Sequence, residues 1–91
     1  MNEKLKELLE LCKNSFSDDE IEEVREFIEV NENKLALETV CAIFYEEKKV
    51  VSREQLELIK YIGKDMTISP QKWERLNVMR YKRTAIVKNA V

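Results

Sequence analysis

The chain has 91 residues, 44% of them hydrophobic, so we expect one domain with a single modest core. Its basic and acidic residues nearly cancel, giving a formal net charge of −2 at pH 7. No apolar run approaches the roughly 18 residues of a transmembrane helix, and the charged start of the chain lacks the apolar core of a signal peptide. These features exclude a membrane-spanning protein and predict a cytoplasmic one.

The composition favours helices over sheet. One Gly and one Pro leave few places for tight hairpin turns, while Glu, Lys and Leu are abundant. We therefore predict an all-α fold, a compact bundle of four to five short helices around a central apolar helix. Residues 1–79 should form this single domain, and residues 80–91 a basic C-terminal extension or tail.

Two helices are predicted before the central one. Residues 3–12 carry apolar side chains at helical spacing, with charged residues on the other face. Ser17 and Glu20 then match a capping box, in which each side chain bonds the other's backbone N–H, and this predicts a helix over residues 18–30. Phe16 and Ile21 are placed to form the accompanying hydrophobic staple.

The most apolar segment, residues 32–47, is predicted to be the central helix. Leu37, Val40, Cys41 and Phe44 follow the i, i+3, i+4, i+7 spacing of a buried helix face. Ala36 and Ile43 widen this face. A helix of this kind needs partners, and the amphipathic segments on both sides are short enough to surround it.

A second capping box, Ser52 with Gln55, predicts the next helix, which should turn Leu56, Ile59 and Ile62 inward and place Gly63 near its C-terminal end. The spacing leaves the orientation of Leu58 open. The preceding pair Val50-Val51 is too short to be expected as a strand with a partner.

The pair Ser69-Pro70 predicts a last helix carrying Trp73, Leu76 and Met79, since Ser suits the N-cap and Pro the first helical position. Beyond it we expect either a fraying extension of this helix or a loosely ordered tail.

The residues do not suggest an enzyme. The chain has no His, no Gly-rich phosphate loop, and only two cysteines, Cys12 and Cys41, which are too few for a zinc site. We expect no catalytic residue, no cofactor and no metal. The two cysteines are interpreted as reduced, structural thiols, with a disulfide or a reactive thiol as the alternative.

Charge is unevenly distributed along the chain. Residues 18–47 contain eleven acidic and two basic residues, whereas residues 80–91 contain four basic residues and no acidic one. The carboxylates of the helix over residues 18–30 occupy adjacent rows, so their fields add. Such a surface either steers an oppositely charged partner or simply keeps the protein in solution.

Four segments of the chain have a characteristic order and spacing. They are residues 26–41, which include Leu35-Ala36-Leu37-Glu38, then Tyr45-Glu46-Glu47, Val51-Ser52-Arg53-Glu54 and Trp73-Glu74-Arg75-Leu76. Together they are similar to small immunity proteins of bacterial polymorphic toxin systems, of the MafI type and of contact-dependent growth inhibition. The resemblance covers most of residues 21–76, and Lys34-Leu35 departs from it.

The resemblance implies a protein that binds and neutralises a cognate toxin domain, a ribonuclease or deoxyribonuclease, by covering its basic substrate cleft. The protein would be a monomer or weak dimer that binds neither nucleic acid nor membrane. The side chains expected to bind the toxin are acidic: Asp19, Glu22, Glu23, Glu26, Glu29, Glu32, Glu46 and Glu47.

The alternative function is a small helical nucleic-acid-binding or regulatory domain. It would use the helix that follows Ser52, or the basic end of the chain, where Arg80, Tyr81, Lys82 and Arg83 interleave an aromatic ring with positive charges. The net negative charge of the rest of the chain disfavours binding to phosphates.

Overall fold

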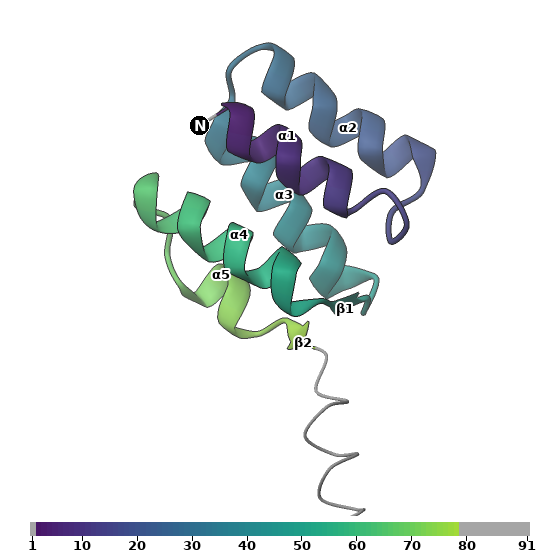
Figure 1. The fold of residues 1–91 in the computed structure, drawn as a ribbon, viewed down its shortest axis with the longest axis vertical. Helices are drawn as coiled ribbons and strands as arrows, with labels where there is room; N and C mark the ends of the chain where they lie inside the picture. Colours follow the sequence, from purple (N-terminus) through teal and green to yellow (C-terminus); the bar gives the residue numbers. More distant parts are fainter. Residues whose placement is uncertain (1, 79–91) are drawn as a thin grey trace, which may run out of the picture.

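The structure, a computed structural model, describes residues 2–78 as five helices and two very short strands (Figure 1). In chain order these are α1 (Asn2–Leu11), α2 (Asp18–Glu29), α3 (Asn33–Glu46), β1 (Val50–Val51), α4 (Arg53–Asp65), α5 (Gln71–Glu74) and β2 (Asn77–Val78). The predicted all-α bundle is confirmed. The predicted tail, residues 80–91, lies outside the described residues.

Helix α3 lies at the centre of the bundle. It packs against each of the other four helices, with α1 and α2 on one side and α4 and α5 on the other (Figure 1). All six apolar residues predicted for its inward face are buried: Ala36, Leu37, Val40, Cys41, Ile43 and Phe44. Phe44 also meets the ring of Phe16, with ring centroids 4.9 Å apart. The central helix predicted from periodicity is therefore confirmed.

Both predicted capping boxes form. The Ser17 hydroxyl accepts a hydrogen bond from the Glu20 backbone N–H at 3.1 Å, and the Glu20 carboxylate accepts one from the Ser17 N–H at 2.9 Å. Ser52 and Gln55 repeat this arrangement at 3.0 and 2.9 Å. Phe16 and Ile21 are both buried, as expected of a hydrophobic staple.

Helices α2, α3 and α4 end in the same way, without glycine. Asn31, Lys48 and Thr67 have φ values of 60°, 54° and 57°, and the next backbone N–H bonds back to a carbonyl five residues earlier, as from Glu32 to Phe27 at 2.9 Å. This is the Schellman motif, which normally places Gly at the left-handed position.

Gly63 does not end a helix. It lies inside α4 with negative φ, and a Cβ at this position would collide with the indole ring of Trp73. The absence of a side chain therefore allows α4 to approach α5 closely.

The end of the domain corrects two predictions. Val50-Val51, expected to have no partner, forms β1 and pairs in parallel with β2, Val50 opposite Asn77 and Val51 opposite Val78. The helix predicted after Ser69-Pro70 is only Gln71–Glu74, so Leu76 is buried outside it. The physical reason is that burial of Trp73, Leu76 and Val51 brings two distant segments together. Met79 lies outside the described residues.

Candidate partner-binding surface

The acidic face of α2 is a continuous row. Asp19, Glu22, Glu23, Glu26 and Glu29 are all exposed, and their spacing places them within about 120° of the helix circumference. Ile21, Val24 and Ile28 occupy the opposite side and are buried. We call these five acidic residues the α2 ridge; it runs about 15 Å along the helix.

Most of the ridge carries no ion pair among residues 2–78. Arg25 lies beside it, and its Nη1 is 2.7 Å from Glu22 Oε1. Both side chains are about half exposed, so this pair is only weakly stabilising. No ion pair is found within the described part of the chain for Asp19, Glu23, Glu26 or Glu29.

The other three predicted residues are exposed but lie at the two ends of α3. Glu32 follows the ridge residue Glu29 at the α2–α3 corner and extends the acidic surface. Glu46 and Glu47 lie at the far end of α3, about 20 Å from Glu32 along the helix axis. The eight residues therefore do not form one compact site.

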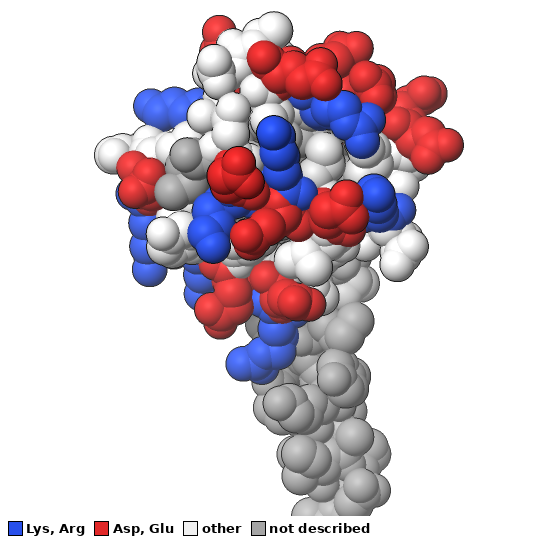
Figure 2. All heavy atoms as spheres, turned by 45° about the horizontal axis from the view of Figure 1, so that its top comes forward, with Lys and Arg blue, Asp and Glu red and all other residues white. Residues whose placement is uncertain are grey.

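Positive charge interrupts the surface near Glu46 and Glu47. Lys48 and Lys49 follow them directly, and Lys49 Nζ is 3.7 Å from Oε1 of Glu20, at the start of α2. The acidic surface is thus continuous from Asp19 to Glu32, and these two lysines separate it from Glu46 and Glu47. Figure 2 shows acidic side chains gathered over the upper right of the molecule, with basic ones between them.

Exposed apolar side chains, which were not predicted from the sequence, flank the acidic surface at both ends. Val30 and Leu35, at the α2–α3 corner, are 65% and 43% exposed. Tyr45 and Val50, near the far end of α3, are 47% and 46% exposed. The sequence pattern indicates such residues only in that each is apolar but lies outside the inward-facing row of a predicted helix.

Tyr45 is oriented by an arginine. The guanidinium carbon of Arg75 lies 3.8 Å from the centroid of the Tyr45 ring, which is a cation–π distance. This contact joins the end of α3 to the residue that follows α5.

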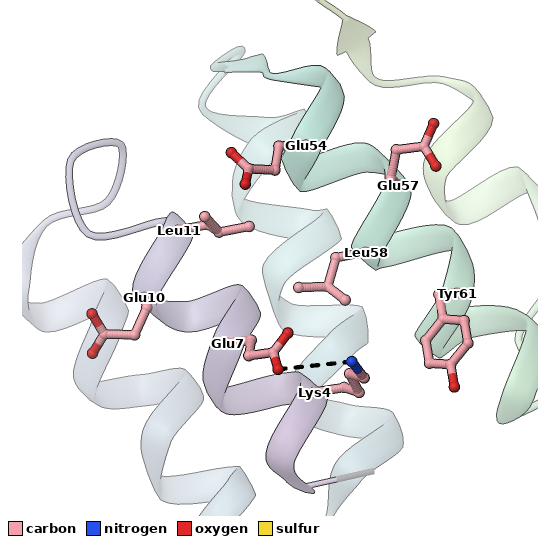
Figure 3. A pocket seen from close by; sticks show the side chains of 8 residues that line it. All are labelled: Lys4, Glu7, Glu10, Leu11, Glu54, Glu57, Leu58 and Tyr61. Carbon is pink, nitrogen blue, oxygen red and sulfur yellow. Dashed lines mark ion pairs between the residues drawn. The ribbon is translucent and has the colours of Figure 1, made fainter.

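A second acidic surface, which was not predicted from the sequence, lies between α1 and α4. It is a groove of about 540 Å³, with Leu11, Leu58 and Tyr61 as its apolar lining (Figure 3). Four carboxylates and one amine complete the lining: Glu7, Glu10, Glu54, Glu57 and Lys4. Leu11 and Leu58 are only partly buried, although Leu58 also packs against the main core, and the juxtaposition of the two helices creates this groove.

The two cysteines are free and buried. Burial raises the pKa of each thiol to about 12, and the neighbouring Cys41 adds to the rise at Cys12. Lys72 and Arg75 oppose the rise at Cys41, but burial dominates. Both thiols are therefore protonated at neutral pH and lack the thiolate that a nucleophile needs.

Residues 2–78 contain neither a metal-binding cluster nor a membrane-spanning helix. No group of three or more His, Cys, Asp or Glu side chains in this part of the chain is arranged to hold a metal ion. None of its helices has both the length and the hydrophobicity to cross a bilayer.

Comparisons with protein-family models, with curated proteins and with solved structures find no match for this chain.

Proposed function

We propose that this protein is an immunity protein, which binds a cognate bacterial toxin domain, a nuclease, and neutralises it by covering its basic substrate cleft. The observation that carries the proposal is the α2 ridge, a row of exposed carboxylates along one helix, four of which have no ion pair among the described residues. A nuclease cleft must be basic to hold phosphates, so it is complementary to such a row.

The position of the ridge suits a rigid binding surface. Helix α2 is held by buried Ile21, Val24 and Ile28 on one side and by a complete capping box at its start. Its outward face is left to solvent. Carboxylates on such a helix keep a fixed spacing, so association orders few additional groups and loses less entropy.

Apolar side chains at the ends of the acidic surface support binding to a protein rather than a purely electrostatic role. Charged rims mainly raise the association rate, whereas buried aromatic and aliphatic anchors slow dissociation. Tyr45 is a suitable anchor, since it is aromatic and exposed, and the exposed Val30 adds apolar area at the other end. The ridge would raise the association rate, and these apolar residues would slow dissociation of the complex.

The proposal predicts that a toxin domain is encoded directly upstream of this protein's gene, and the test is coexpression with that domain. If the proposal is right, the two proteins co-purify and cells survive toxin expression only when the full chain is present. Survival without the chain, or survival with it in the absence of any complex, would contradict the proposal.

A matched pair of variants links the result to the ridge. Glu23→Lys with Glu26→Lys alters the ridge, while Asp65→Lys with Glu74→Lys makes the same charge change at exposed positions elsewhere. Protection should be lost with the first pair and kept with the second. Equal loss of protection in both variants would indicate that protection depends on net charge and not on the ridge.

A further inference from the structure

We propose that the groove between α1 and α4 binds the chain's own basic segment, residues 79–91. This interaction is separate from the α2 ridge and does not depend on the proposed function. Its basis is the lining of the groove, its charge, and the place where β2 ends.

The groove has the composition of a binding site for a basic segment with apolar side chains. Leu58 projects between the helices, Leu11 lies beside it, and Tyr61, 55% exposed, forms one end (Figure 3). Contact with these side chains would remove apolar surface from water. A segment that carried charge alone would leave this lining uncovered.

The charge around the groove is negative. Lys4 is partly neutralised by Glu7, at 3.7 Å between Nζ and Oε2, and Glu10 pairs with Lys13, at 3.1 Å. Glu54 and Glu57, on the α4 side, have no ion pair within residues 2–78. Two carboxylates beside an apolar lining are therefore available to a cation.

Residues 79–91 have the complementary chemistry. They contain Arg80, Lys82, Arg83 and Lys88 and no acidic residue, with apolar side chains such as Ile86 and Val87 between the charges. Other stretches that are basic and apolar without acidic residues, such as residues 48–53, are shorter, and residues 48–53 already contribute to β1 and the start of α4. Charge complementarity thus selects this segment among those in the same molecule.

The end of β2 places the segment within reach. Val78 pairs with Val51, which lies three residues before Glu54 in the chain, at most about 11 Å away. The groove then extends along α4 from Glu54 to Tyr61, about 10 Å. The thirteen residues after Val78 can span more than 40 Å when extended, so they can round the start of α4 and follow the groove.

Zero-length carbodiimide coupling of the full chain at low concentration tests the contact directly. Mass spectrometry of the digested monomer should find Lys82 or Lys88 joined to Glu7, Glu10, Glu54 or Glu57. Links to the α2 ridge at equal yield would overturn the proposal, because they would reflect charge without a specific site. Links confined to covalent dimers would also overturn it, since the groove would then bind a second copy.

Limited trypsin digestion supplies an independent measurement. Glu54→Gln with Glu57→Gln should raise the cleavage rate after Lys82 and Arg83 about fivefold, the effect expected from loss of two exposed ion pairs. The matched control, Glu23→Gln with Glu26→Gln, removes the same charge from the ridge and should leave this rate unchanged. Identical cleavage rates in both variants and the parent would contradict docking in the groove.

Discussion

At the scale of single residues, Gln55 joins two helices. It is only 5% exposed, and its side-chain oxygen completes the capping box of α4. Its Nε2 donates a hydrogen bond to the Leu11 carbonyl at 2.8 Å, at the end of α1. The capping box was predicted from the sequence, but this bond was not, because it joins positions 44 residues apart.

The Gln55→Glu variant separates the two roles. A glutamate preserves the capping box but replaces the donor with a carboxylate facing the Leu11 carbonyl. We expect the free energy of unfolding to fall by about 1–3 kcal/mol at pH 7, the cost of an unsatisfied buried group. Urea denaturation measures it. A variant as stable as the parent would show that the bond to Leu11 contributes nothing.

The backbone of Thr67 is strained. It is β-branched and exposed, yet it has a φ of 57°, in the left-handed region that favours glycine. Thr67→Gly should therefore raise the free energy of unfolding by about 1 kcal/mol, since the left-handed conformation costs other residues about 1–2 kcal/mol. Thermal and urea denaturation would show the increase. A destabilised Gly variant would mean that the Thr67 side chain makes contacts worth more than the strain.

At the scale of elements, the helices were predictable because their signals are local. Apolar periodicity and the caps at Ser17 and Ser52 act within a few residues of the chain, whatever the rest of the fold does. The pairing of β1 with β2 could not be predicted, because a strand of two residues shows no periodicity. The position of β2 also depends on the burial of Trp73 and Leu76, which is a tertiary contact. Likewise, the groove exists only where α1 meets α4.

The capping boxes should contribute measurably to stability. Replacing Ser17 or Ser52 by Ala removes the acceptor for one N–H of the first turn, which typically costs about 1 kcal/mol. Both serines cap their helices in the structure, so urea denaturation of each variant should show this decrease in the free energy of unfolding. Glycine at the same positions should cost only a few tenths of a kcal/mol. A larger loss for Gly than for Ala would argue against the cap.

Phe44 tests the central helix. It is only 1% exposed and contacts the ring of Phe16, so Phe44→Ala should remove about 3–5 kcal/mol through lost burial and a residual cavity. In a domain of this size that loss could abolish folding, which circular dichroism would detect. Tyr45→Ala, at the exposed neighbouring position, is the control and should cost far less. Similar stabilities for the two variants would contradict the assigned core.

At the scale of the whole molecule, negative charge is concentrated on two surfaces. The α2 ridge and the groove between α1 and α4 are two acidic surfaces on one small bundle, while the basic residues 80–88 follow the described domain in sequence. The sequence predicted the ridge, since one amphipathic helix carries it. It did not predict which of the eight acidic residues lie together, because that depends on how α2 and α3 pack.

The central claim is that the α2 ridge binds a basic toxin cleft, and association kinetics test it most directly. The parent, the ridge variant Glu23→Lys with Glu26→Lys, and the control Asp65→Lys with Glu74→Lys are each mixed with the cognate toxin domain at low and moderate salt. Circular dichroism should show that each variant is folded, as expected for exposed substitutions.

If the ridge steers the toxin, the ridge variant should associate on the order of tenfold more slowly at low salt and lose much of the salt dependence of the rate. The control variant, with the same net charge, should stay close to the parent. A folded ridge variant with an unchanged association rate and salt dependence would contradict the account and exclude α2 as the toxin-binding surface.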